Sequence, residues 1–398
     1  MQRAIHMVPA MQLPAASPLR YAVGGLIGMA AAMGIGRFVY TPILPGMMAE
    51  LGLSASQAGW IAAANYVGYL VGALLGSGGW AQGRERAIAL GAIGVSTVLL
   101  AAMGLTDSVT VFIIVRFLAG VASAFMMVFL STIVFSRFAA AGRPGLQGLH
   151  FSGVGIGIAI SGLMTGALVL AGQPWQAGWL WAAGISALAL VMVAMLVSDG
   201  PVVTGVARRE PALPKDPALT RIILSYGLFG FGYVITATFL VAIVREGAGG
   251  RLFESAVWVV TGLAAPPSIW LWTKVSQRIG IAHTIVIGTL VEAFGVMASV
   301  AIGGSAGPLL AAVLFGGTFV AITALGLQVA RRLAHGAPRR ALALMTAAFG
   351  VGQIVGPIFA GVVADVTGSF FIPSIGAALV LVASAWFAWD SGRRSGAV

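Results

Sequence analysis

Three charged side chains lie inside long apolar stretches of this sequence: Arg37, Arg116 and Glu292. A charge at the centre of a lipid bilayer costs about 2.5–3.5 kcal/mol even on a lenient insertion scale, so such residues usually mark a cavity or a pathway. No acidic residue lies in the apolar stretches near the two arginines, and we therefore expect each to seek an anionic partner. Arginine suits this role because its planar fork binds a carboxylate or a phosphate through two hydrogen bonds.

Each of these residues also has a purely structural interpretation. The guanidinium group of either arginine can pair with helix-end carbonyl groups and hold helices together, and the element around Arg116 can serve gating instead. Glu292 is the only acid deep inside an apolar stretch, which makes it the candidate for proton coupling, since carboxyl groups act in proton relays across membranes. The alternative for Glu292 is a neutral acid that is hydrogen-bonded to a neighbouring helix.

Aromatic and amide side chains accompany the two arginines. Several of them are three, four or seven positions apart, and this spacing places them on common helix faces. Binding cavities combine aromatic surfaces with a few polar groups. The sequence therefore predicts a substrate-binding set of Arg37, Tyr40, Asn65, Tyr69, Arg116, Tyr226, Tyr233 and Gln353. Simple helix packing is the alternative for each residue taken alone.

The elements that must position these residues are membrane-spanning helices. Of the 398 residues, 59% are hydrophobic and only 8% are charged, whereas roughly 25% of the residues of a soluble domain are charged. A helix needs about 20 apolar residues to cross a hydrocarbon core of about 30 Å. Twelve stretches meet this requirement: 21–45, 57–77, 87–105, 109–136, 149–171, 178–197, 221–244, 255–273, 284–303, 308–330, 341–364 and 371–389. The predicted fold is an all-α membrane protein with twelve transmembrane helices.

These stretches divide the chain into two six-helix halves. The expected division is an N-terminal lead at 1–20, a first bundle at 21–197, a linker at 198–220, a second bundle at 221–389 and a tail at 390–398. Outside the spans, nearly all Lys and Arg residues fall on one side, and only Arg245 and Arg251 fall on the other. Cytoplasmic loops carry this excess, so we expect lead, linker and tail in the cytoplasm and the protein in the inner (plasma) membrane. The same pattern accounts for the net charge of +11 without nucleic-acid binding.

The two halves also repeat one another. Residues 34–41 align with 230–237, residues 56–60 with 254–258, and Gln82 with Gln277, at offsets of 196, 198 and 195. Parallel repeats of six spans are typical of major facilitator transporters, which bind substrate near the midplane between the halves.

Several motifs resemble one branch of the major facilitator superfamily. They are Gly34-Ile-Gly-Arg-Phe-Val-Tyr-Thr-Pro-Ile-Leu-Pro45, Gln57-Ala-Gly-Trp-Ile-Ala-Ala-Ala-Asn-Tyr-Val-Gly-Tyr-Leu70, Tyr226-Gly-Leu-Phe-Gly-Phe-Gly-Tyr233, Phe315-Gly-Gly-Thr-Phe319 and Gly350-Val-Gly-Gln-Ile-Val-Gly-Pro357. Over nearly its whole length the chain is similar to the YbfB/YjiJ-type branch. This resemblance implies the major facilitator fold of two pseudo-symmetric bundles, with spans one and four lining a central cavity.

The chain departs from the superfamily pattern in its gating elements. Gly352, Gly356 and Pro357 in the eleventh stretch resemble an antiporter element that the superfamily carries in span five. The gating aspartate that follows span two is replaced by Gln82, and by Gln277 in the second copy. A salt-bridged latch of the usual kind is therefore not expected there, and we expect these five residues to serve gating or helix packing.

Together these features predict a secondary active transporter that moves a small organic solute by alternating access. The embedded arginines favour an organic anion or carboxylate, driven by a solute or proton gradient. A multidrug exporter of cations is less consistent with six acid-free spans, and a membrane sensor, scaffold or lipid-handling protein is the alternative from another class. The sequence shows no cysteine, no metal-ligand cluster, no nucleophile with its base and no phosphate-binding loop. We therefore expect no enzyme, cofactor or metal, and a monomer whose partners are the substrate, the bilayer and protons.

Overall fold

The computed structural model describes residues 17–199, 210–247 and 249–396. Throughout these residues the regular secondary structure is helical, and twelve helical segments are long and apolar enough to cross a membrane. The predicted all-α fold with twelve spans is confirmed. Most of the expected lead (1–16) and part of the expected linker (200–209) lie outside the described residues.

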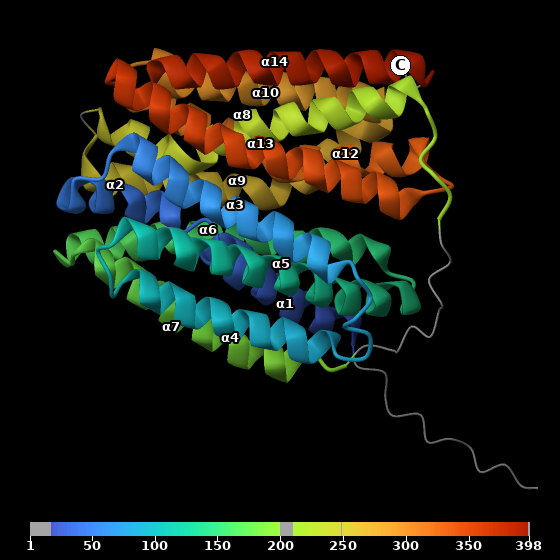
Figure 1. The fold of residues 1–398 in the computed structure, drawn as a ribbon, viewed down its shortest axis with the longest axis horizontal. Helices are drawn as coiled ribbons and strands as arrows, with labels where there is room; N and C mark the ends of the chain where they lie inside the picture. The colour runs from blue at the N-terminus through green and yellow to red at the C-terminus, as the bar shows by residue number, and fades with distance from the viewer. Residues whose placement is uncertain (1–16, 200–209, 248, 397–398) are drawn as a thin grey trace, which may run out of the picture.

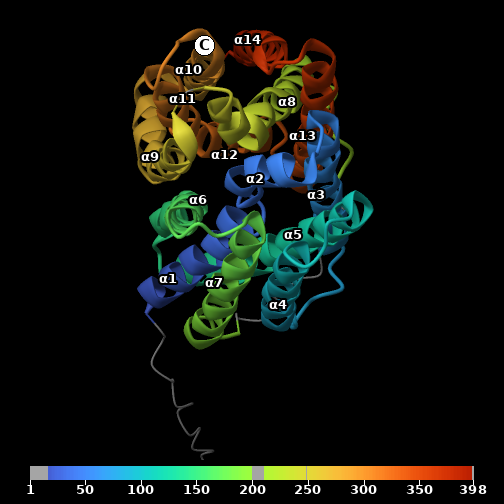
Figure 2. The same ribbon diagram turned by 90° about the vertical axis from the view of Figure 1, so that its left-hand side faces the viewer.

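The helices form two bundles that follow one another along the chain (Figures 1 and 2). The first bundle comprises α1 (Pro18–Met29), η1 (Ala30–Ile35), α2 (Tyr40–Leu51), α3 (Ala55–Gly76), α4 (Glu85–Met103), α5 (Val109–Ala140), η2 (Pro144–Leu146), α6 (Gln147–Leu170) and α7 (Trp175–Leu196). The second comprises α8 (Pro217–Arg245), α9 (Gly250–Ile279), α10 (Ile281–Ala301), α11 (Ala306–Gly316), α12 (Phe319–Leu333), α13 (Pro338–Thr367) and α14 (Phe371–Arg394). Because the number of spans is even, α1 begins and α14 ends at the same face. We call this the terminal face, and the opposite one the far face.

Many helices extend past the predicted apolar stretches. For example, α12 takes in Arg331 and Arg332, and α14 takes in Asp390, whose carboxylate accepts a hydrogen bond of 2.9 Å from Arg394. Hydropathy marks only the part of a helix that crosses hydrocarbon, whereas the backbone hydrogen bonds continue until the helix is capped. The first residues of the expected tail are therefore helical.

The two bundles pack against each other mainly through α6 with α9, α3 with α13, and α2 with α8. Glycines allow these helices to approach closely. A Cβ added at Gly59 would lie 2.3 Å from the carbonyl oxygen of Pro357, and one added at Gly262 would lie 2.3 Å from the amide nitrogen of Ala159. Real Cβ atoms do not come this close, so the interface requires glycine at both positions, as is common between membrane helices.

Two spans are broken within the membrane. Span one passes from α1 through the π-helical η1 and a turn at residues 36–39 before α2 begins. Span ten is interrupted between α11 and α12 at Gly317 and Thr318. Irregular backbone at membrane depth is tolerated where it is buried in protein or lines a cavity, and π-helical turns are frequent at functional sites. Both breaks lie close to the cavity between the bundles.

Candidate substrate cavity and its closure

A cavity of about 200 Å³ lies between the two bundles. Two of its lining residues lie near helix ends at the terminal face: Phe151 is four residues after the start of α6, and Leu327 is six residues before the end of α12. The cavity therefore lies on the terminal-face side of the interface. Its wall is formed by Met29, Met33, Arg37, Phe38, Tyr69, Met127, Phe151, Val154, Tyr226, Tyr233, Ile269, Phe319, Val320, Thr323, Ala324, Leu327, Thr346, Phe349 and Gln353.

Arg37 is the charged residue of this wall. It lies in the turn that breaks span one and is 4% exposed. Its guanidinium carbon is 4.5 Å from the ring centroid of Tyr66 and 4.4 Å from that of Tyr69, distances at which a cation is attracted to an aromatic face. Within the described residues, Nε and Nη2 of Arg37 are buried and have no hydrogen-bond partner. Because buried charge is costly unless it is paired, this edge of the guanidinium group favours an added acceptor.

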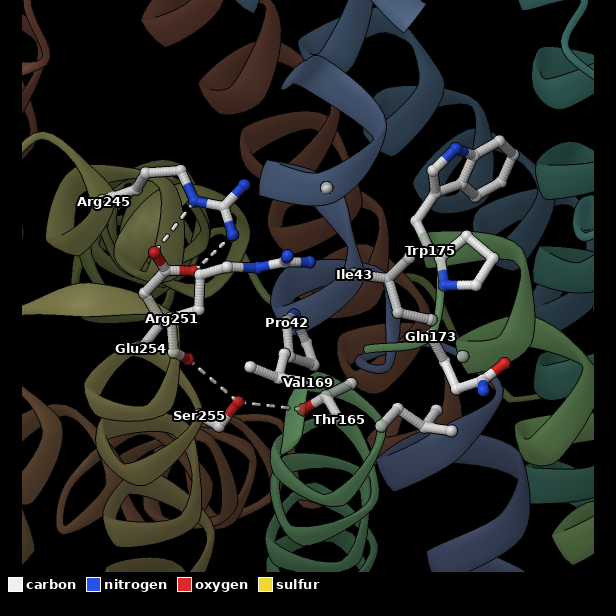
Figure 3. A pocket seen from close by; sticks show the side chains of 14 residues that line it. Pro42, Ile43, Thr165, Val169, Gln173, Trp175, Arg245, Arg251, Glu254 and Ser255 are labelled. Atoms are coloured by element: carbon white, nitrogen blue, oxygen red, sulfur yellow. Dashed lines mark hydrogen bonds and ion pairs between the residues drawn. The ribbon is translucent and has the colours of Figure 1, made fainter. Parts of the chain in front are cut away.

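Arg245 shows how the Nε and Nη2 edge of an arginine binds a carboxylate. Arg245, at the end of α8, holds the carboxylate of Glu254 in α9 through Nε at 2.8 Å and Nη2 at 2.6 Å (Figure 3). These are the same two nitrogens that lack a partner in Arg37. A carboxylate held in this two-point way is fixed in both position and orientation. The free edge of Arg37 is thus suited to a carboxylate.

The second bundle faces the cavity with near-parallel aromatic rings. In spatial order they are Tyr226, Phe349, Tyr233, Phe319 and Phe315, and we call them the aromatic array. Successive ring centroids are 4.7, 5.4, 6.1 and 5.0 Å apart, with interplanar angles of 28°, 12°, 6° and 15°. All except Phe315 line the cavity. Such contacts are favourable by about 0.5–1.5 kcal/mol per pair beyond area burial, so neighbouring rings of the array stabilise one another.

The structure brings five of the eight predicted substrate-binding residues together at this cavity: Arg37, Tyr69, Tyr226, Tyr233 and Gln353. Nε2 of Gln353 donates a hydrogen bond to the hydroxyl of Tyr233. The hydroxyl of Tyr226 donates to the carbonyl oxygen of Thr323 at 3.2 Å. These bonds link α8 to α13 and to α12, and they hold the two tyrosine rings in place.

The other three predicted residues, Tyr40, Asn65 and Arg116, lie outside the cavity wall. Arg116 is 3% exposed and donates to the carbonyl oxygens of Gly36 at 3.2 Å and Arg37 at 3.0 Å. Nδ2 of Asn65 donates to the carbonyl oxygen of Arg116 at 3.0 Å, and the ring of Tyr40 lies 5.1 Å from the guanidinium group of Arg116. We call these three residues the bracing network. Arg116 binds carbonyl groups in the turn that breaks span one.

Glu292 lies outside the cavity wall, against the break in span ten. Its side chain is fully buried, and Oε2 accepts a hydrogen bond of 2.8 Å from the hydroxyl of Thr318. Among the described residues, Oε1 has no partner and no ion pair involves this carboxyl group. On the other side of the break, the indole of Trp272 donates to the carbonyl oxygen of Gly317 at 2.6 Å. The interrupted span is therefore held by side chains from α9 and α10.

Toward the far face, hydrogen bonds join the two bundles directly. The hydroxyl of Thr41 donates to the carbonyl oxygen of Ala237 at 2.5 Å, and the indole of Trp258 donates to the hydroxyl of Ser161 at 3.1 Å. Figure 3 shows the pocket that remains between the bundles at this end, which measures about 40 Å³. The interface is closed toward the far face.

One further link in this closure, Asp365, was not expected from the sequence. Its carboxylate, in the last turn of α13, accepts hydrogen bonds from the backbone N–H of Ala55 at 2.8 Å, from that of Ser56 at 3.0 Å and from the hydroxyl of Ser56. An acid of the second bundle thus caps the N-terminus of α3 in the first, where free N–H groups and the helix dipole favour negative charge. The sequence feature that could have indicated this contact is the position of Asp365, an acid directly after the predicted stretch 341–364.

The predicted gating or packing residues of span eleven lie against α8 and α3. A Cβ added at Gly352 would lie 2.1 Å from the carbonyl oxygen of Gly227, and one added at Gly356 would lie 2.7 Å from that of Phe231. Both glycines therefore permit close packing within the second bundle. The neighbouring Pro357 presents its carbonyl group to the first bundle.

Gln82 and Gln277 are exposed near the terminal face. Neither side chain makes a hydrogen bond within the part of the chain that the structure describes. In this conformation they do not join the two bundles.

The internal repeat appears directly in the contacts. Thr41 and Ala237, which are equivalent at the offset of 196, are hydrogen-bonded to each other. Arg37 and Tyr233, also 196 positions apart, face the cavity from opposite bundles. Equivalent positions meet only near the pseudo-two-fold axis, so the cavity lies beside this axis.

Comparison with known proteins agrees with this architecture. A family model described as "Uncharacterised MFS-type transporter YbfB" matches residues 29–388. The chain belongs to this family. Both the predicted branch and the predicted major facilitator fold are confirmed, and the protein is a multi-pass membrane transporter. A search of curated protein sequences gives no significant match.

Solved structures of two transporters resemble this member of the YbfB family. The nucleoside transporter NupG aligns with a TM-score of 0.72 and 16% identity, covering 94% of this chain and 98% of that chain. A bacterial homologue of the human lysosomal transporter Spinster, in an inward-facing and occupied conformation, aligns with a TM-score of 0.71 and 14% identity over 95% of this chain and 98% of that one. At such low identity the likeness concerns the fold.

Proposed function

We propose that this transporter moves a small organic anion by secondary active transport, and that Arg37 binds the anion. The observation that carries the proposal is the buried edge of the Arg37 guanidinium group, which has no acidic partner among the described residues and belongs to the wall of a cavity between the bundles. A carboxylate supplies both the missing charge and the missing acceptors. Membership in a transporter family supports transport over a purely sensory or scaffolding role.

We further propose alternating access from the conformation seen here. The cavity lies toward the terminal face, while hydrogen bonds and the cap at Asp365 close the far face. The excess of Lys and Arg supports placing the terminal face in the cytoplasm. On this assignment the structure is an inward-facing state of a monomer in the inner membrane, with both termini cytoplasmic. The inward-facing Spinster homologue is a similar structure.

The proposal is tested by the thermal stability of the purified protein with benzoate, acetate, succinate, choline or glucose. The variants are Arg37→Ala, Arg37→Lys and, as a matched loss of positive charge on an exposed far-face residue, Arg251→Ala. A ligand at 100 times its dissociation constant adds about 2.7 kcal/mol of stability. We expect at least one carboxylate to raise the melting temperature of the wild type and of Arg251→Ala but not of Arg37→Ala. Arg37→Lys should respond weakly, because an ammonium group keeps the charge without the fork.

Stabilisation by choline or glucose alone, or carboxylate binding that survives in Arg37→Ala, would contradict an anion site at Arg37. Uptake of the stabilising carboxylate into proteoliposomes then separates transport from sensing. Binding without uptake would favour the sensor alternative.

We also propose Glu292 as the proton-carrying group. The support is its complete burial, with one hydrogen-bond donor and no cationic partner in the described residues. An ionised carboxylate in such surroundings is costly, so gain or loss of the proton changes the contact with Thr318 at the break in span ten. In proteoliposomes, Glu292→Gln should lose the acceleration of uptake by an imposed pH gradient but retain exchange of labelled for unlabelled substrate. Glu246→Gln, an exposed acid at the far face, is the control, and an unchanged pH response in Glu292→Gln removes Glu292 from coupling.

A further inference from the structure

We propose that the anion bound at Arg37 is a flat aromatic molecule with a single negative charge, of the aromatic monocarboxylate class. This inference rests on the proposed function, because it assigns the ligand of the same site. Two separate features carry it: the number of charges that the cavity offers, and the shape of the wall that faces Arg37.

The cavity offers one positive charge. Arg37 is the charged member of the wall, whose other residues are apolar or aromatic apart from Thr323, Thr346 and Gln353 and the tyrosine hydroxyls. The neighbouring Arg116 directs both terminal nitrogens at backbone carbonyl groups of span one. A second carboxylate on the ligand would therefore be buried without a cation, which is costly. The charge count selects a monoanion over a dicarboxylate.

The wall contributed by the second bundle favours a flat ring. Four rings of the aromatic array line the cavity, and successive rings of the array are within 28° of parallel. Aromatic rings attract one another in offset-stacked or edge contacts, through their quadrupoles as well as through buried area. A flat ligand ring can therefore pack against a ring of the array in the same way that neighbouring rings of the array pack against each other. A saturated ring with the same number of carbons is thicker and carries no such quadrupole.

Arg37 and the array are close enough for one small molecule to contact both. Phe38, which follows Arg37 in the chain, already makes an edge contact with Phe319 of the array, with ring centroids 6.2 Å apart. A carboxylate at the guanidinium edge therefore places its ring against the second bundle. Such a ligand bridges the two bundles, so it stabilises a state in which they close around it.

The test uses three compounds of nearly equal size and one larger dianion with the full-length protein in detergent. They are benzoate, cyclohexanecarboxylate, the dianion terephthalate and neutral benzamide, measured by calorimetry at a pH at which the acids are ionised. We expect benzoate to bind at least ten-fold more tightly than each of the other three.

Variants identify the cause of the preference. Phe349→Leu removes the ring between Tyr226 and Tyr233 but keeps an apolar side chain, and Phe319→Leu is a second variant of the same kind. Each should reduce the ratio of the benzoate to the cyclohexanecarboxylate affinity to below about three-fold. Phe239→Leu, a buried phenylalanine outside the cavity wall, is the control and should keep the ratio.

Three results would overturn the inference: equal affinity for benzoate and cyclohexanecarboxylate, tight binding of terephthalate, or an aromatic preference that survives in both array variants. Binding through Arg37 without aromatic preference defeats this inference and leaves the proposed function standing. Failure of every carboxylate to bind, or equal binding by Arg37→Ala, defeats both.

Discussion

The central cavity and the far-face closure occupy neighbouring parts of the same interface, yet their charged side chains differ in whether they have partners. At the cavity, the Nε and Nη2 atoms of Arg37 have no partner among the described residues. Toward the far face, Asp365 of the second bundle accepts hydrogen bonds from α3 of the first, and Arg245 binds Glu254 at two points within the second bundle. In the bracing network, Arg116 donates to two carbonyl groups of the turn that breaks span one. The exposed fractions of the two buried arginines are nearly equal, at 4% and 3%. The partner, rather than the depth, separates the arginine that we propose as the ligand site from the arginine that braces helices.

The contrast also suits a transporter that alternates between two states. The hydrogen bonds that join the bundles at the far face form in one state and must break in the other. A cavity with an unsatisfied charge gains most from a ligand that contacts both bundles. A ligand shifts such an equilibrium only through its different affinity for the two states.

The largest expected effect tests the two arginines against each other. Arg116→Ala leaves the carbonyl oxygens of Gly36 and Arg37 without their donor, and we expect it to lower the free energy of unfolding by about 3 kcal/mol. Arg37→Ala removes an unsatisfied charge, so we expect the same free energy to change by less than about 1 kcal/mol or to rise. Denaturant unfolding of both variants in detergent measures this difference. Equal destabilisation would remove the distinction between the cavity and the bracing network.

The next effect concerns the cap formed by Asp365. Hydrogen bonds to a charged group contribute about 1.5–3 kcal/mol, so we expect Asp365→Ala to open the far face at least about ten-fold more often. The chain has no cysteine, and Ile43→Cys in the far-face pocket (Figure 3) therefore provides a single labelling site. The rate of reaction with a membrane-impermeant maleimide should rise in Asp365→Ala.

Asp107→Ala is the control for this experiment, because Asp107 is an exposed acid in the far-face loop between α4 and α5. An unchanged labelling rate in Asp365→Ala would show that the cap does not hold the closure.

The smallest expected effect tests the boundary between the two regions. The hydroxyl of Tyr40 donates to the carbonyl oxygen of Ala58 at 2.9 Å, outside the cavity wall. Tyr40→Phe should lower the free energy of unfolding by about 1 kcal/mol and leave the dissociation constant of benzoate within about two-fold. A large loss of benzoate affinity with unchanged stability would place Tyr40 in the binding site instead.

The sequence alone was sufficient for the spans and for the symmetry of the two halves. A bilayer core leaves a long apolar stretch no way to satisfy its backbone except as a helix, so hydropathy along the chain determines the twelve spans. The repeat at offset 196 is equally a property of the chain, and the hydrogen bond between Thr41 and Ala237 shows its result. The depth of Arg37 in an apolar stretch also indicated that it needs a partner, although its role as an anion site remains a prediction.

Only the tertiary structure decided which charged groups already have hydrogen-bond partners. Arg116 donates a hydrogen bond to the carbonyl oxygen of Arg37, 79 positions away in the sequence, and Asp365 accepts one from the backbone N–H of Ser56, 309 positions away. The aromatic array likewise combines rings from α8, α11, α12 and α13. Hydrophobic spacing specifies which face of a helix is buried, but a hydrogen bond depends on the distance and direction between two atoms on different helices. Those are set by how the helices cross, and so the division between a braced closure and an unsatisfied cavity appears only once the twelve spans are packed.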